Sequence, residues 1–244
     1  MNWRAAVAEL VGTFAFFFIG AGAICTNAYT SGGVGLVGIA LAHGLVLSIM
    51  ISSFGAISGG HFNPAVSIAF AVTGRIGPLQ AVVYVVAQLV GGVLAGLVLR
   101  TIFGQVFPEA VTGPAHLGTP GLAPEVSFGT GVLIEAVLTF FLLLAIYGTA
   151  VDQRAPRTIA GFGIGLTVGL DILMGGPLTG AAMNPARTFG PAVAAGFWDN
   201  HLVYWIGPIV GGVIAAVLYE FVFIDRARAP APAVLESTET SPAA

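Results

Sequence analysis

The sequence predicts an all-α membrane protein with six transmembrane helices, two re-entrant half-helices and an inverted internal repeat. Three observations predict this fold class: the composition, six long apolar stretches, and motifs that recur in the two halves of the chain. Hydrophobic residues make up 57% of the 244 positions, charged residues only 8%, and mean hydropathy is +0.96. A soluble domain carries about 25% charged residues, so the bilayer is the expected solvent.

The charged and sulfur-containing residues exclude several functions. The net charge is −3, and the eight arginines form no basic run, so nucleic acid is not an expected partner. The single Cys25 cannot form an internal disulfide. The chain has no nucleophile–base or metal-ligand spacing, so we expect a protein that is not an enzyme and has no metal site and no cofactor.

Six stretches are long and apolar enough to cross a bilayer, which takes about 20 helical residues. All six should be helices, because lipid offers no partners for open backbone groups. The fifth stretch is the shortest. The predicted spans are Ala5–Ile24, Val34–Phe54, Leu79–Ile102, Phe128–Ala150, Ile159–Met174 and Leu202–Ile224.

The arginines predict the orientation, because positive residues favour the cytoplasmic side of a membrane. With the N-terminus inside, six of them fall on that side: Arg4, Arg75, Arg154, Arg157, Arg226 and Arg228. Both termini should then be cytoplasmic, and Arg100, near the outer end of the third span, is the exception. The short loops and plain tail favour the inner membrane of a prokaryotic cell.

The chain repeats itself, and three landmarks recur in the same order. The segment around Glu9 resembles that around Glu135, Phe62–Ala65 resembles Met183–Ala186, and Tyr84 with its following glycines resembles Tyr204, at offsets of 126, 121 and 120 residues. Each half holds three spans, so the second half must enter the membrane from the opposite face. We expect one channel domain over residues 1–224, with repeats at about 1–103 and 128–224. The remainder, 225–244, has the composition of a disordered cytoplasmic tail.

Two copies of one motif, Asn63-Pro64-Ala65 and Asn184-Pro185-Ala186, each begin an apolar stretch of about ten residues. Ten helical residues span roughly 15 Å, half of a ~30 Å hydrocarbon core. Asn is a strong N-cap and Pro is favoured at the first helical position. Two half-helices entering from opposite faces would therefore bring two positive dipole ends together at mid-membrane. Such a site excludes cations, protons included, and tolerates neutral dipolar solutes.

From Ala5 to Ile224 the chain resembles the aquaporins, or major intrinsic proteins, above all in the segments Ser58–Ala65 and Gly180–Arg187. The resemblance implies an aquaporin-like fold and a passive channel for water and small neutral solutes. It also implies a homotetramer in membrane lipid, with one pore per subunit. Backbone carbonyls of five loop residues would line that pore: Gly59, Gly60, His61, Gly180 and Ala182.

The resemblance also assigns a selectivity filter: His43, Ile172, Ala181 and Arg187. This set is similar to that of plant tonoplast-type aquaporins, whereas strict water channels usually carry Phe at the first position and His at the second. It implies permeability to ammonia besides water, with urea, hydrogen peroxide and glycerol as further candidates. Thr188 and the pair Tyr204-Trp205 differ from the residues of dedicated glycerol facilitators.

Four buried ionisable residues leave an alternative open. Glu9 and Glu135 occupy equivalent places in the repeats, where they could accept hydrogen bonds from the backbone of the re-entrant loops. Together with Asp171 and His43 they could instead relay protons in a proton-coupled secondary transporter of a small solute. Two positive helix ends beside a proton path argue against that second hypothesis.

Overall fold

The computed structural model describes residues 2–155 and 157–224, so the predicted tail, 225–244, lies outside the described residues. Within these ranges the chain forms helices and loops and no strand. Six of the helices there are long and apolar enough to cross a membrane, which confirms the predicted fold class. The six spans are formed by α1 (Trp3–Tyr29), α2 (Gly35–Ser58), α4 (Pro78–Val106), α6 (Phe128–Ile146), α7 (Ala160–Thr179) and α9 (Val203–Leu218), with short helical segments that extend the last three to Phe128–Val151, Arg157–Thr179 and Val203–Phe223.

Shorter helical segments complete the bundle. Two half-length helices, α3 (Pro64–Val72) and α8 (Pro185–Ala195), follow the two Asn residues of the repeated motif. One-turn π-helices, Tyr147–Val151 and Tyr219–Phe223, continue α6 and α9. A short α5 (Glu109–Thr112) lies in the long loop before α6.

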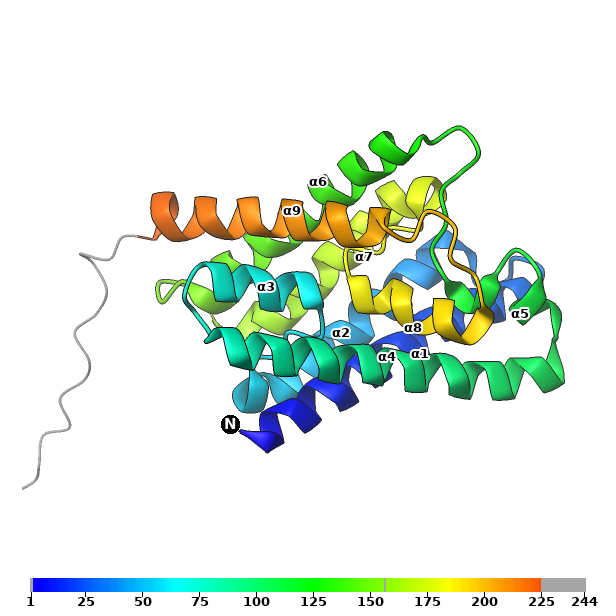
Figure 1. Cartoon of the computed structure of the whole chain (residues 1–244), viewed down its shortest axis with the longest axis horizontal. Helices are drawn as coiled ribbons and strands as arrows, with labels where there is room; N and C mark the ends of the chain where they lie inside the picture. Colours follow the sequence, from blue (N-terminus) through cyan, green and yellow to red (C-terminus); the bar gives the residue numbers. More distant parts are fainter. Residues whose placement is uncertain (1, 156, 225–244) are drawn as a thin grey trace, which may run out of the picture.

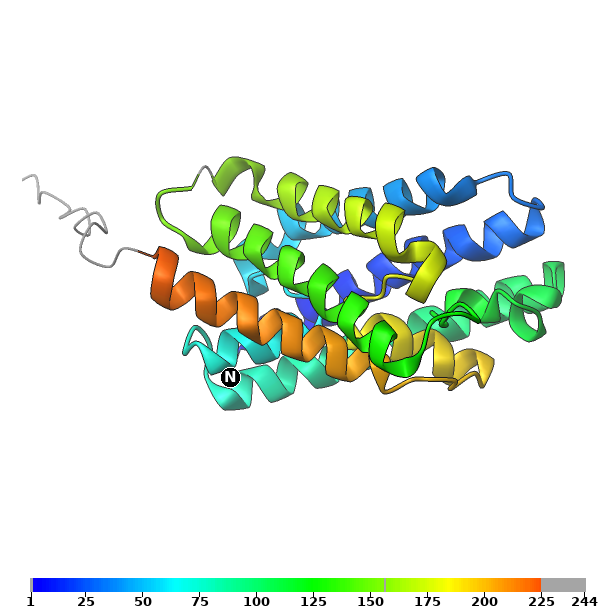
Figure 2. The same ribbon diagram turned by 90° about the horizontal axis from the view of Figure 1, so that it is seen from above.

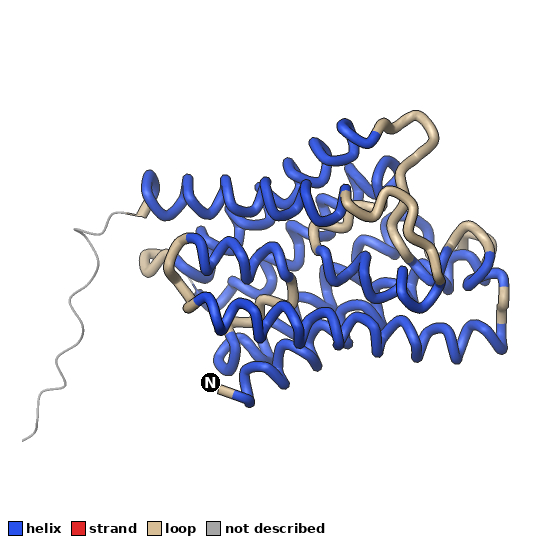
Figure 3. Tube along the Cα trace, in the orientation of Figure 1, coloured by secondary structure: helices blue, strands red, loops and turns tan. Residues whose placement is uncertain are grey.

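The half-helices lie one after the other along the long axis of the bundle, and α4 runs beside both (Figure 1). In the view turned by 90°, α2 and α7 lie on one side and α3, α4 and α8 on the other (Figure 2). Loops gather at the two ends, and two more run inside the bundle, where α2 leads to α3 and α7 to α8 (Figure 3). The start of α1 and the end of the described part of α9 lie at the same end (Figure 1).

Several predicted spans were too short. The fifth, predicted to end at Met174, continues as α7 to Thr179 and contains Pro177. The Gly-Gly-Pro segment suggests a helix end, but lipid supplies no partners for open backbone groups, and the helix continues until Gly180 caps it with φ +82°. Similarly, α4 runs to Val106, beyond the predicted Ile102.

Glycines at equivalent positions of the two repeats bring α2 and α7 into close contact. A Cβ on Gly44 of α2 would lie 2.6 Å from the Gly165 carbonyl oxygen of α7, and a Cβ on Gly165 would overlap the Gly44 carbonyl oxygen. These positions are 121 residues apart, the same offset as the two Asn residues of the motif. Only glycine permits this approach of backbones, which fixes how the halves meet.

Candidate transmembrane pore

Both half-helices begin with the same cap. The Asn63 side-chain oxygen accepts a hydrogen bond from the Ala65 N–H at 2.9 Å, and Asn184 accepts one from the Ala186 N–H at 3.0 Å. Both asparagines have extended backbones, and the proline that follows each stands at the first helical position. The local sequence therefore explains each helix start without tertiary help.

Tertiary hydrogen bonds join the two caps. The Asn63 amide donates to the Met183 carbonyl at 2.8 Å, and the Asn184 amide donates to the Phe62 carbonyl at 2.9 Å. Each asparagine thus binds the residue just before the other one, and the two positive helix ends are adjacent. An amide NH₂ has two donors, so each side chain keeps one N–H with which to meet a solute.

Two buried carboxylates hold the loops that precede the half-helices. Glu9 of α1 accepts from the backbone N–H groups of His61 and Phe62 at 2.9 and 2.6 Å. Glu135 of α6 accepts from those of Ala182 and Met183 at 2.9 and 2.7 Å. Buried loop N–H groups need such acceptors, because they have no helical partner. Both glutamates therefore accept hydrogen bonds from the backbone of the re-entrant loops, which is one of the two roles that the sequence leaves open for them.

Further support comes from residues that the sequence analysis did not assign to the site. Hydroxyl groups of Ser58 and Thr179 donate to Glu9 and Glu135 at 2.6 and 2.7 Å. Tyrosine hydroxyls donate to the carbonyls of these same residues, each at 2.8 Å, from Tyr84 and Tyr204. The repeat offset of 120–121 residues relates these pairs and could have revealed them. Gln88, which donates to Glu9 at 2.8 Å, has no amide at the related position, Pro208.

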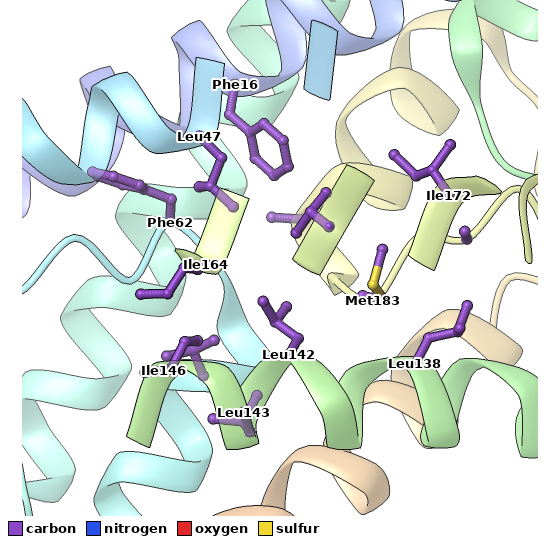
Figure 4. Close-up of a cluster of buried hydrophobic side chains, with 14 of the residues drawn as sticks. Phe16, Leu47, Phe62, Leu138, Leu142, Leu143, Ile146, Ile164, Ile172 and Met183 are labelled. Carbon is purple, nitrogen blue, oxygen red and sulfur yellow. The ribbon is translucent and has the colours of Figure 1, made fainter. Parts of the chain in front are cut away.

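A cavity of about 610 Å³ runs beside the joined caps. Its polar lining includes eight of the predicted pore residues: Gly59, Gly60, His61, Asn63, Ala181, Ala182, Asn184 and Arg187. The opposite wall is apolar and comes from α1, α2, α6 and α7; Figure 4 shows Phe16, Leu47, Leu142 and Ile164 of this buried cluster. His43, Ile172 and Gly180 do not line it. A polar strip facing an apolar wall suits a file of small dipolar molecules.

The filter candidates lie where buried polar atoms lack protein partners. Arg187 is 3% exposed, and its Nε and Nη1 atoms have no hydrogen-bond partner among the described residues. His43 bonds through Nδ1 to the Ile39 carbonyl at 2.9 Å, and its buried Nε2 has no partner there either. Ile172 is buried and belongs to the apolar cluster, in which Figure 4 labels it together with Met183. Oδ2 of Asp171 is also buried and has no hydrogen-bond partner among the described residues.

The cavity extends to the loop between α6 and α7. Arg157 and Thr158 line it there. The neighbouring loop is held by Arg154, whose side chain donates to Asp152 and also to the Phe223 carbonyl at 2.7 Å. Hydrogen bonds from the Arg154 side chain and backbone lower the pKa of Asp152 to about 2, so this ion pair persists at neutral pH.

Six spans, two opposed half-helices and a cavity along their joined ends define a polytopic α-helical membrane channel. The sequence profile described as Major intrinsic protein matches residues 1–219. The chain therefore belongs to the major intrinsic proteins, the aquaporin family, whose members are passive channels and not enzymes.

Relatives place the chain near the tonoplast-type branch. It is 47% identical to Aquaporin TIP4-4 of Zea mays, with 91% of this chain and 88% of the relative covered. It is 43% identical to Probable aquaporin TIP3-2 of Arabidopsis thaliana, covering 93% and 86%. Among solved structures, the aquaglyceroporin from Plasmodium falciparum matches with a TM-score of 0.76 at 27% identity, covering 91% of this chain and 97% of the other.

These comparisons confirm the predicted family and its tonoplast-type relationship. They also establish an integral, multi-pass membrane protein that conducts water and small solutes. The expected prokaryotic inner membrane gains no support, because both of these relatives are plant proteins.

Proposed function

We propose that this channel conducts ammonia as well as water, through a filter formed by His43, Ile172, Ala181 and Arg187. The observation that carries the proposal is that buried donors of Arg187 and a buried ring nitrogen of His43 have no hydrogen-bond partner among the described residues. Arg187 offers two buried donor nitrogens, Nε and Nη1, and the Nε2 atom of His43 can accept a hydrogen bond when its Nδ1 donates to Ile39. A neutral solute that both accepts and donates satisfies such groups on passage.

Ammonia fits these groups because it is small, neutral and able to donate and accept. Ala181 lines the cavity together with Arg187 and adds little bulk, and Ile172 is a buried apolar residue. Urea, hydrogen peroxide and glycerol are further candidates, and we expect urea and glycerol to pass more slowly than ammonia because they are larger. Ammonium is excluded by the Arg187 charge and the two helix dipoles.

Liposomes loaded with a pH-sensitive dye test the proposal. In an ammonium gradient, vesicles that contain the protein should alkalinise faster than empty vesicles, and stopped-flow shrinkage of the same preparation gives the water permeability. Rapid water flow with alkalinisation no faster than in empty vesicles would show a strict water channel and contradict the proposed filter.

Proton-coupled transport remains the alternative to a passive channel for the small solute. Against it, the carboxylates of Glu9 and Glu135 each accept two backbone N–H bonds, so protonating either would cost hydrogen bonds. Solute flux measured with and without a pH gradient separates the two mechanisms. A channel gives the same permeability in both conditions, whereas a coupled transporter follows the gradient.

We further propose that residues 1–224 form one channel domain with both termini in the cytoplasm. Arginines close to the described termini support this orientation: Arg4 lies in the first turn of α1, Arg75 pairs with Glu220, and Arg154 donates to the Phe223 carbonyl. In a Cys25→Ser background, an impermeant thiol reagent should label His116→Cys from outside and Ala155→Cys only after permeabilisation. The reverse pattern would invert the topology.

The family resemblance also supports a homotetramer. Large apolar side chains are exposed on every long helix of the single chain, so some can face lipid and others a neighbouring subunit. Native mass spectrometry in mild detergent should give four subunits, and a monomer under conditions that preserve water transport would contradict this.

A further inference from the structure

Arg100 breaks the arginine pattern, and the structure gives it a specific partner. It lies on α4 near the outer end, and its guanidinium donates a hydrogen bond to the carbonyl oxygen of Ala194. Ala194 stands in the last turn of α8, where helix carbonyls have no intrahelical partner. A cation there also interacts favourably with the negative end of the helix dipole.

Arg100 continues a stripe that follows α8 along its whole length. Gly92, Gly96 and Arg100 are spaced by four, so they lie on one face of α4. A Cβ on Gly92 would lie 2.9 Å from the Ala186 carbonyl oxygen, at the start of α8. A Cβ on Gly96 would lie 2.8 Å from the Gly190 carbonyl oxygen, in its middle. The two glycines therefore allow the helices to approach, and Arg100 holds the far end.

The filter arginine depends on this arrangement because its own side chain has few restraints. At the start of α8, the Asn184 side chain donates to the Phe62 carbonyl. At its end, the Arg100 side chain joins the last turn of α8 to α4. Arg187 lies between these two anchors and projects N–H groups that have no partner among the described residues. Its position in the pore is therefore set by where α8 sits, and any sliding of α8 along α4 would move the guanidinium.

A related contact lies at the C-terminal end of the other half-helix, α3. There the arginine follows the half-helix, and its partner on the flanking span is an acidic residue. The residue 120 positions after Arg100 is Glu220 of the π-helix that continues α9. It forms an ion pair at 2.8 Å with Arg75, which follows the C-terminal end of α3. In both repeats, then, a guanidinium at the C-terminal end of the half-helix joins it to its flanking span. The recurrence favours a positioning role over an incidental surface contact.

We propose that Arg100 is a positioning residue of the pore. By capping the last turn of α8 on α4, it holds Arg187 at the depth where the guanidinium narrows the path for neutral solutes. The expected signature is a change of selectivity and not only of the amount of folded channel.

Full-length variants in proteoliposomes test this proposal, with permeability normalised to the reconstituted protein. Arg100→Met removes the charge and the donors and keeps an apolar stem. It should raise the ratio of urea to water permeability by about fivefold, the size expected when one hydrogen bond of average net strength is lost. Arg100→Lys, which keeps a charge and donors, should restore the wild-type ratio. Arg4→Met, on an exposed arginine far from α8, is the matched control and should leave the ratio unchanged.

A double-mutant cycle distinguishes positioning from general destabilisation. If Arg100 acts through Arg187, then Arg100→Met should add no further rise in the ratio in an Arg187→Val background. An unchanged ratio in folded Arg100→Met, or an equal fall of urea and water flux, would overturn the proposal.

A second pair of variants serves if Arg100→Met does not fold. Arg100→Gln keeps a donor but removes the charge, so it should raise the ratio, whereas Arg100→Lys should not. Equal ratios in these two variants would overturn the proposal. Because urea-to-water selectivity is measured without ammonia, failure here leaves the ammonia result to be judged separately.

Discussion

The two re-entrant loops share one scaffold but differ in how their polar atoms are satisfied. In each, an asparagine caps the half-helix and a glutamate accepts hydrogen bonds from the loop backbone. A serine or threonine hydroxyl also donates to that glutamate, and a tyrosine hydroxyl donates to the backbone carbonyl of the same serine or threonine. In the first repeat, the His61 ring bonds to Ser67 at 3.0 Å, and Gln88 bonds to both Ser67 and Glu9. That loop therefore satisfies many of its polar side chains within the protein.

The second loop lacks these side-chain partners. Ala182 and Thr188 stand where the first loop has His61 and Ser67, and Arg187 stands in place of Val66. Arg187 keeps unpaired donors, as described above. The difference teaches that the repeat preserves the frame of the two loops, whereas, of the two half-helices, only the second holds buried side-chain atoms without a partner among the described residues, on Arg187 and Thr188.

The largest expected effect comes from breaking what the loops share. Glu9→Ala and Glu135→Ala leave four and three buried donors without their acceptor, at about 1–3 kcal/mol each. Both variants should lose most folded protein, and Glu9→Ala should be the less stable. Thermal denaturation in detergent measures this. A Glu135→Ala protein with wild-type thermal stability would show that the carboxylate is not needed to hold its loop.

Exchanging the charged position between the halves should have the next largest effect. Arg187→Val makes the second loop like the first, and should raise proton conductance by about tenfold or more, because a fixed charge at membrane depth creates a barrier of a few kcal/mol. Water flow should stay within about twofold, since the half-helix dipoles and asparagines remain. The reciprocal Val66→Arg should reduce water flow by placing a second buried cation in the cavity. Pyranine-loaded liposomes report the leak, and an unchanged leak in Arg187→Val would assign the proton barrier to the helix dipoles alone.

A smaller change should follow from rebuilding the filter as in strict water channels. The double variant His43→Phe with Ile172→His adds a ring and moves the polar group to the other wall of the pore. Ammonia permeability should fall severalfold towards that of empty vesicles, while water permeability is retained. The ammonium-gradient assay measures this, with each single variant as a control. Equal ammonia flux in the double variant would remove His43 and Ile172 from the filter.

The smallest effect concerns mercurial reagents, which bind thiols. Cys25 is fully buried against Leu99, Ala110 and Leu117 and does not line the cavity, so the unmodified channel should be inhibited only weakly. Ala181 lines the cavity, and Ala181→Cys should make water flow sensitive to the reagent. Osmotic shrinkage with and without mercurial checks both. Strong inhibition of the wild type that Cys25→Ser abolishes would contradict the burial of this thiol.

Much of the fold could be predicted because its causes are local. Lipid forces apolar stretches into helices, and Asn-Pro begins a half-helix through its own cap and proline. The internal repeat then predicted the opposed halves, and it also singled out the two glutamates, which are 126 positions apart. Span ends were less predictable: the Gly-Gly-Pro segment before Thr179 stays helical because of what surrounds it.

Sequence alone determined the class of this protein, its six spans and two half-helices, and the residues that could meet at mid-membrane. Tertiary structure decided which polar atoms find partners there. Asn63 bonds to Met183, and Arg100 to Ala194, across 120 and 94 positions of the chain. Arg187 is left with unpaired donors although its local sequence matches that of a helix start. The physical reason is that caps and spans depend on hydrogen bonds between near neighbours, whereas the satisfaction of a buried polar group depends on every element that packs around it.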